Sequence, residues 1–165
     1  MAAGNTYEAI ATQTLSSAAA SVTFSSISGA YTDLVLVFSG ATSTSTSYVS
    51  LQYNSDTGSN YSVTLLRGNG TAASSSRYSS ITEIYASISA TNTTDINNVI
   101  FQIQNYSNST TYKTSLSRAN NAGVSTEAGV GLWRNTAAIT SVKVLSPTNN
   151  FATGSTFTLY GIAAA

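Results

Sequence analysis

Few residues in this sequence could carry out acid–base chemistry, and no two of them are close together in the chain. The chain has no histidine and no cysteine, which removes the commonest general base, thiolate nucleophiles, disulfide bonds and thiolate metal ligands. A glycoside hydrolase would need two carboxylates about 5–10 Å apart in a cleft, and no spacing indicates such a pair. The sequence therefore predicts a protein that is not an enzyme and that binds no cofactor or metal. The isolated carboxylates are Glu8, Asp33, Asp56, Glu83, Asp95 and Glu127.

One segment places oxygen-bearing side chains at alternate positions, as calcium-binding loops do. It runs from Asn54 to Asn60 (NSDTGSN), but it holds a single carboxylate and lacks the distal glutamate of such loops. Asn and Asp side chains also hydrogen-bond to the backbone two residues ahead and thereby stabilise turns. We therefore predict a hairpin turn, with a calcium site as the alternative.

The single tryptophan, Trp133, allows two interpretations. An exposed indole ring could stack on a sugar or anchor a protein partner. A ring in the protein core is equally compatible with the segment, because Val130 and Leu132 precede it among small glycines. We predict a core position and keep glycan stacking by Trp133 as the alternative.

Short segments with strand patterns fill the chain and would have to position these residues. Residues 31–38 form a continuous apolar run, which is typical of a strand buried on both faces, and most other segments alternate apolar and polar residues. No segment keeps a period of 3.6 residues. The sequence predicts an all-β fold, an antiparallel β-sandwich or barrel of about 8–10 short strands with almost no helix. The strand candidates are residues 7–15, 20–24, 31–38, 48–53, 61–66, 80–85, 99–104, 112–116, 129–133, 139–145 and 157–162.

The 165 residues fit one domain. We expect an N-terminal arm at residues 1–8 and a single β-sandwich domain at residues 9–165. The serine- and threonine-rich stretches 43–47 and 71–76 are expected to be loops. The last strand is expected to pair near the first and to leave no free sheet edge.

Charge is scarce and balanced, with six basic and six acidic residues that make up 7% of the chain, where about 25% is usual. No basic stripe favours nucleic acid, and no apolar run approaches the ~20 residues of a membrane-spanning helix. The N-terminus has no basic and apolar signal pattern, so we expect synthesis in a host cytoplasm without membrane insertion. A net charge near zero favours association into an assembly.

Six segments in a fixed order carry a resemblance to a known family. They are residues 12–18 (TQTLSSA), 22–27 (VTFSSI), 31–37 (YTDLVLV), 53–62 (YNSDTGSNYS), 131–139 (GLWRNTAAI) and 154–162 (GSTFTLYGI). In this series the chain resembles small β-rich structural proteins of tailed bacteriophages, including cyanophages, and segments at the ends of phage tail fibres. The resemblance spans nearly the whole chain, although residues 67–121 match only in character. It implies a jelly-roll-like sandwich in the virion, either as a capsid decoration (cement) protein, often trimeric, or at a fibre tip.

Capsid decoration is the favoured expectation, because the first predicted strand follows Met1 within a few residues and leaves no segment for a fibre shaft. The chain is then expected to be a homotrimer that binds the major capsid protein and stabilises its lattice. The alternative is a tail-fibre or receptor-binding protein that recognises a host-surface glycan. The expected partner-binding residues lie in the arm and in two polar loops, 41–48 and 68–77: Ala2, Ala3, Gly4, Asn5, Thr6, Tyr7, Thr44, Ser45, Asn69 and Arg77.

Overall fold

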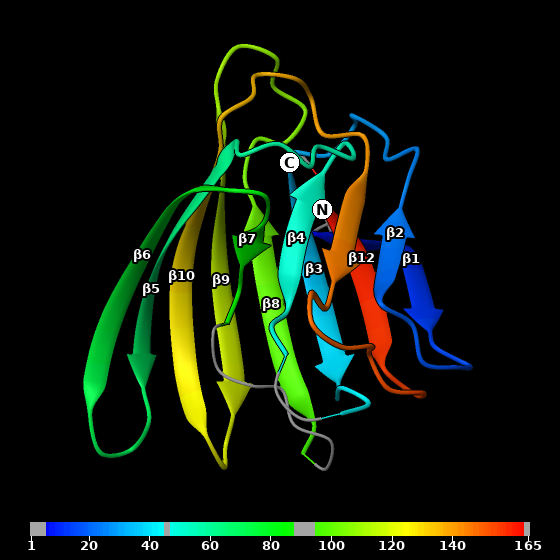
Figure 1. The fold of residues 1–165 in the computed structure, drawn as a ribbon. Coiled ribbons are helices and arrows are strands. Elements are labelled where there is room, and N and C mark those ends of the chain that lie inside the picture. Colours follow the sequence, from blue (N-terminus) through cyan, green and yellow to red (C-terminus); the bar gives the residue numbers. More distant parts are fainter. Residues whose placement is uncertain (1–5, 45–46, 88–94, 164–165) are drawn as a thin grey trace.

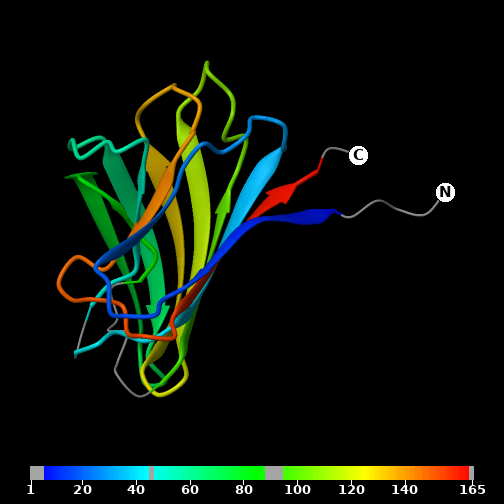
Figure 2. The ribbon, with the colours of Figure 1, turned by 90° about the vertical axis from the view of Figure 1, so that its right-hand side faces the viewer.

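Two antiparallel β-sheets pack face to face in a sandwich (Figures 1 and 2). The architecture comes from a computed structural model, which describes residues 6–44, 47–87 and 95–163. These residues contain no helix, and the predicted all-β antiparallel sandwich is confirmed. The jelly-roll-like connectivity is a finer statement and stays a prediction.

The described residues form twelve strands, eight in a large sheet and four in a small sheet. The large sheet has the order β1-β12-β3-β8-β9-β10-β5-β6, and the small sheet has the order β2-β11-β4-β7. The large sheet consists of β1 (Tyr7–Thr14), β3 (Asp33–Gly40), β5 (Tyr61–Gly68), β6 (Ala73–Ile81), β8 (Asn97–Ile103), β9 (Lys113–Asn121), β10 (Ser125–Trp133) and β12 (Thr156–Ile162). The small sheet consists of β2 (Ser21–Phe24), β4 (Ser50–Tyr53), β7 (Ile84–Tyr85) and β11 (Val142–Leu145).

Side chains of the large sheet alternate between the core and solvent. In β9, every second residue from Lys113 to Asn121 is buried and the residues between them are exposed. This period of two places one face of the large sheet against the small sheet and leaves the other face outward. The inner face contributes large aromatic side chains to the core. The fully buried aromatic residues are Phe38, Tyr53, Tyr61, Phe101, Tyr106, Trp133, Phe151 and Phe157.

Glycines in β10 allow β7 to pack closely on the large sheet. A Cβ atom on Gly131 would lie 2.4 Å from Cγ2 of Ile84 and 2.9 Å from Oγ of Ser115. A Cβ atom on Gly129 would be crowded in the same way, 2.5 Å from Cδ2 of Leu65. The glycines of this strand therefore serve the close approach of neighbouring side chains.

Strand β6 corrects the prediction of a loop at residues 68–77. The turn occupies only residues 69–72, and residues from Ala73 onward pair with β5. The serine-rich segment has no apolar alternation because it is the edge strand of the sheet, and most of its residues are exposed. The predicted strand at 80–85 is also split, since β6 ends at Ile81 and β7 begins at Ile84. For these reasons the strand count exceeds the expected 8–10.

The first and last strands pair with each other, as expected. Thr12 lies opposite Thr158, and their hydroxyl groups are 3.1 Å apart in a hydrogen bond. The expected loss of a free edge is wrong, because β12 pairs with β3 on its other side and β1 remains an edge strand. Except for Ile10, every residue of β1 is exposed. The strand thus presents both faces and one backbone edge to solvent.

Candidate functional site

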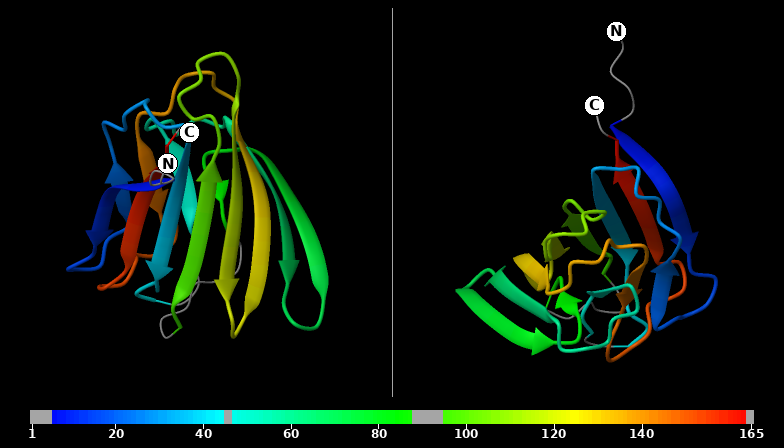
Figure 3. Two further views of the ribbon diagram at one scale, coloured as in Figure 1. Left: turned by 180° about the vertical axis from the view of Figure 1, so that it is seen from behind. Right: turned by 90° about the horizontal axis from the view of Figure 1, so that it is seen from above.

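The outer face of the large sheet, which is the face turned away from the small sheet, is covered by none of the described elements (Figure 3, left). Val130 lies opposite Leu116 on β9, and Ala128 lies opposite Leu66 on β5. Leu66 is 62% exposed, Val130 45% and Leu116 43%. Neighbouring exposed apolar side chains are typical of a surface that another molecule covers. We call these four residues the apolar strip: Leu66, Leu116, Ala128 and Val130.

Two arginines flank the apolar strip. Arg118 lies opposite Ala128, and Arg77 lies opposite Thr64. Both arginines are exposed, and within the described part of the chain neither guanidinium group has a hydrogen-bond or ion-pair partner. A groove of about 540 Å³ lies beside Arg118. Its lining residues are Leu66, Arg67, Gly68, Ala73, Ser74, Arg118, Ala119, Asn120, Thr126, Glu127 and Ala128.

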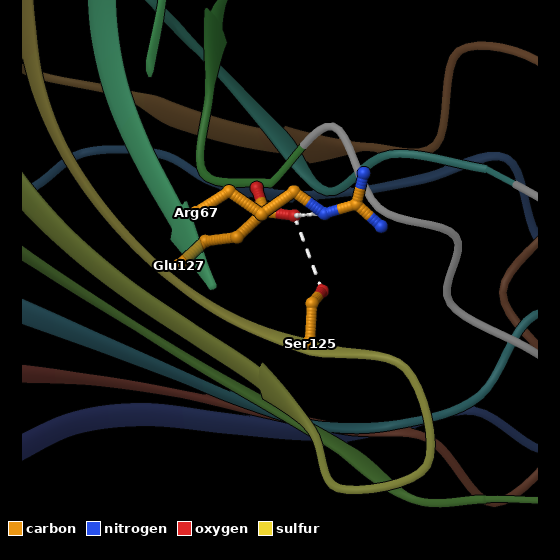
Figure 4. A network of polar contacts seen from close by, with 3 residues as sticks. All are labelled: Arg67, Ser125 and Glu127. Carbon is orange, nitrogen blue, oxygen red and sulfur yellow. Dashed lines mark hydrogen bonds and ion pairs between the residues drawn. The ribbon is translucent and has the colours of Figure 1, made fainter. Parts of the chain in front are cut away.

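A polar network lies on adjacent strands β5 and β10 (Figure 4). Arg67 and Glu127 are cross-strand partners, with Nε of Arg67 3.6 Å from Oε1 of Glu127. Ser125 Oγ donates a hydrogen bond to the same oxygen at 3.4 Å. The Glu127 side chain is 1% exposed and that of Arg67 is 31% exposed. The pair therefore neutralises a buried carboxylate and leaves part of the guanidinium group open to solvent, where it could bind an anion.

Lys113 is a second buried charge, at the opposite end of the same sheet region. Its Nζ donates hydrogen bonds to the carbonyl oxygens of Thr111 at 2.7 Å and Thr136 at 3.0 Å. Burial lowers the pKa of Lys113 below its ordinary value. With both bonds directed to backbone oxygens, Lys113 holds two loops together and has a structural role.

Trp133 is fully buried, which confirms the predicted core position and contradicts the alternative that its ring stacks on a glycan. The ring lies parallel to that of Tyr61, 6.3 Å away, and 5.6 Å from that of Tyr53. Its Nε1 donates a hydrogen bond of 2.7 Å to Oδ2 of Asp56. Burial alone would raise the pKa of Asp56, but the hydrogen bonds from Trp133 and Asn60 hold it below its ordinary value.

Residues 54–60 form the predicted turn between β4 and β5. Asp56 Oδ1 accepts a hydrogen bond from the backbone N–H of Gly58 at 2.8 Å, and Asn60 Nδ2 donates to Oδ2 at 2.9 Å. Asn54 has a positive φ of 51°, and its Oδ1 accepts a hydrogen bond from the backbone N–H of Thr140. The protein's own donors occupy these oxygens, which favours the predicted turn over the calcium site. The turn is not a hairpin, however, because β4 lies in the small sheet and β5 in the large sheet, so that it connects the two sheets.

The residues expected to bind partners do not come together in one site. Thr6 and Tyr7 lie at the start of β1, at one edge of the large sheet, and Tyr7 is 55% exposed. Asn69 and Arg77 belong to the β5–β6 hairpin at the opposite edge. Thr44 is exposed in the loop after β3. Of these residues, Arg77 alone borders the apolar strip. Ala2, Ala3, Gly4, Asn5 and Ser45 lie outside the described residues.

The described part of the chain lacks two further kinds of site. No group of three or more His, Cys, Asp or Glu residues there could hold a metal ion. None of the described ranges contains a helix that is long and apolar enough to span a membrane.

Comparisons with known proteins assign the chain to no family. No family model matches the sequence, and no curated protein matches it. Among solved structures, an alginate lyase matches with 10% sequence identity and a TM-score of 0.38, over 91% of this chain and 76% of that chain. A match at this level carries no activity over to this chain. The resemblance to phage structural proteins stays a prediction.

The expectation that this chain is not an enzyme does not stand, because none of the comparisons shows that the chain lacks catalysis. The absence of catalysis is therefore no longer part of the interpretation. The missing histidine and cysteine exclude only those mechanisms that use an imidazole or a thiolate.

Proposed function

We propose that this chain is a virion structural protein, a capsid decoration (cement) protein that binds the major capsid protein through the outer face of its large sheet. The observation that carries the proposal is the apolar strip, in which Leu66, Leu116 and Val130 are exposed on an uncovered sheet face. The location in the virion rests on the resemblance of the six sequence segments. Host-surface glycan as the main partner, on a tail fibre, is the alternative.

Such a protein acts by holding neighbouring capsid subunits together. A decoration protein that contacts several capsid subunits at once adds free energy to the assembled lattice, because it binds the assembled state in preference to the free subunits. As a homotrimer, it would repeat one surface around a closed symmetry axis. A face rich in serine, threonine and apolar side chains carries little charge to desolvate on docking.

The location is tested by labelling intact virions with an antibody to this protein and viewing them by electron microscopy. Label spread over the head is the expected result. Label confined to the tail would overturn capsid decoration and favour the tail-fibre or receptor-binding alternative. Absence of label from every part of the virion would overturn both.

The surface is tested by adding purified protein to capsids that lack it and measuring occupancy after sedimentation. Leu66→Asp places a charge in the apolar strip, and we expect it to abolish binding. Ile96→Asp is the matched control, because Ile96 is 66% exposed but lies outside the strands. Equal binding by both variants would show that the outer face is not the contact. Light scattering on the free protein tests the trimer, which a monomer mass would exclude.

A further inference from the structure

Three tyrosine rings contact one another where β7, the edge strand of the small sheet, meets β6, the edge strand of the large sheet. The centroids of Tyr48 and Tyr85 are 5.7 Å apart. Tyr78, from the edge strand β6 of the large sheet, meets Tyr85 edge-on at 5.5 Å and an interplanar angle of 79°. Tyr48 is 36% exposed, and the other two are half-buried. We call Tyr48, Tyr78 and Tyr85 the tyrosine cluster.

A carboxylate without partners lies beside the tyrosine cluster. Glu83 is 8% exposed, and within the described ranges no hydrogen bond or ion pair reaches its carboxylate. Glu83 immediately precedes β7, two residues before Tyr85, and Lys143 lies on β11, two strands away in the same sheet. Burial raises the pKa of Glu83, and Lys143 lowers it in part.

The small sheet holds these groups in place. Gln52 Nε2 donates a hydrogen bond of 3.0 Å to the carbonyl oxygen of Thr82 and so fixes the bend that carries Glu83. Gln52 is itself the cross-strand partner of Lys143, so both side chains lie on the same face. The site is therefore built on strands rather than on a free loop, which favours a defined geometry.

Because nearly all buried polar groups in native proteins have a hydrogen-bond partner, the carboxylate of Glu83 is left to bond with water or with a ligand. Solvent still reaches the oxygens of Glu83. A ligand with hydroxyl donors could therefore reach Glu83 from solvent. Aromatic rings beside such an acceptor supply an apolar surface, so that the site combines stacking with hydrogen bonding.

We propose that the tyrosine cluster and Glu83 bind a sugar residue of a neutral glycan. The exposed ring of Tyr48 stacks on the apolar face of the pyranose, Glu83 accepts hydrogen bonds from adjacent hydroxyl groups, and Lys143 donates one. An acidic sugar is disfavoured because its carboxylate would meet Glu83. The inference goes beyond the proposed function and does not depend on it, since the tyrosine cluster is separate from the outer face of the large sheet: Tyr78 pairs with the buried Val63, on the inner side of that sheet.

The test uses an array of neutral oligosaccharides built from glucose, galactose, mannose and N-acetylglucosamine, printed beside acidic ones with uronic or sialic acid. Dense display on the array strengthens a weak single-site interaction. The best neutral ligand is then titrated into wild-type protein and three variants that retain the wild-type circular dichroism spectrum. They are Tyr48→Ala, Glu83→Gln and the control Tyr112→Ala, which removes a tyrosine that is 54% exposed elsewhere.

Wild-type protein should bind neutral glycans in preference to acidic ones. Tyr48→Ala and Glu83→Gln should each weaken binding at least about tenfold, the effect of one lost stacking contact or charge-assisted hydrogen bond. Tyr112→Ala should bind as wild type does. The proposal is overturned if no neutral glycan binds, if acidic glycans bind better, or if all three variants behave alike. These results are independent of the antibody labelling that tests capsid decoration, so either proposal can fail without the other.

Discussion

Two surfaces of the sandwich present different groups to solvent. On the large sheet, apolar side chains such as Leu66 and Val130 stand exposed on neighbouring strands and contact no other layer. At the edge of the small sheet, the aromatic side chains contact one another, and the buried Glu83 immediately precedes the strand β7 that carries Tyr85. One face is a broad apolar area with few directional groups, and the other is a small site that combines rings with a hydrogen-bond acceptor.

This difference indicates what each face can recognise. A broad sheet face gains most of its binding energy from the area that a partner covers, which suits a protein lattice. A cluster of rings around one acceptor buries little area and depends on the position of single groups, which suits a small polar ligand. The strands that support the two surfaces also differ in length. The small-sheet site relies on the short strand β7, whereas the apolar strip lies on the long strands β5, β9 and β10.

The largest expected effect concerns the packing that holds β7 in place. Gly131→Ala should lower the free energy of unfolding by about 1–3 kcal/mol, because the new Cβ would crowd Ile84 and overpacked cores cost this much. Urea denaturation measures the change. Gly68→Ala is the matched control, since its Cβ would lie 4.0 Å from the nearest atom and should change stability by less than about 0.5 kcal/mol. Equal effects would mean that β10 does not anchor the small-sheet face.

A second pair of variants compares one side chain from each face. Tyr85→Ala should lower the free energy of unfolding by about 2 kcal/mol, because the ring packs against Tyr48 and Tyr78. Leu116→Ala should cost clearly less, since Leu116 is 43% exposed and lies on the uncovered face. Thermal unfolding at one pH measures both. A larger loss for Leu116→Ala would show that the apolar strip already packs against something in the free protein.

A pH series tests the buried carboxylate of the small-sheet face. The raised pKa of Glu83 means that its favourable contribution is complete below the ordinary value of 4.5 and is lost as pH rises through the folded pKa. Glu83→Gln, which resembles the protonated form, should therefore stabilise the chain at neutral pH and change little in acid. Unfolding is measured from about pH 3 to about pH 8. A variant less stable than wild type at neutral pH would show that the charged form is already paired.

Asp56→Asn is the control of opposite sign in the same series. The pKa of Asp56 lies below its ordinary value of 3.8, so its contribution to stability is present above that value and is lost as pH falls. The variant should be less stable than wild type at neutral pH, and the difference should shrink in acid. If both variants shifted stability in the same direction at neutral pH, the two carboxylates would not have the opposite environments described for them.

Sequence patterns sufficed for the parts of this fold where burial alternates along a strand. A continuous apolar run predicts the strand at residues 31–38 and a strand-like pattern predicts the one at 99–104, and β3 and β8 lie there. The edge strand β6 was missed because an edge that little else covers needs no apolar alternation, and its serines resemble a loop. The turn at Asn54–Asn60 was predictable, because Asx hydrogen bonds are local.

Neither surface proposed to bind a partner could be predicted, because both depend on pairing between distant strands. Leu66, Leu116 and Val130 are far apart in the sequence and become neighbours only through the register of β5, β10 and β9. The tyrosine cluster likewise joins residues from both sheets. The core position of Trp133, by contrast, is predictable from its own strand, because Val130 and Leu132 precede it among small glycines.

The smallest expected effect on stability comes from reversing the charge of Arg118, on the outer face of the large sheet. Arg118→Glu should change the free energy of unfolding by less than about 0.5 kcal/mol, because the side chain is exposed and unpaired in the described part of the chain. If the large-sheet face docks on a capsid surface, the same variant should still weaken capsid binding, since Arg118 borders the strip and reversal of its charge changes the electrostatic fit. The weakening should diminish at high salt, where exposed charges are screened. Glycan binding at the tyrosine cluster should be unaffected, because that site is separate from the outer face of the large sheet; a loss of glycan binding in Arg118→Glu would mean that the two surfaces do not act separately.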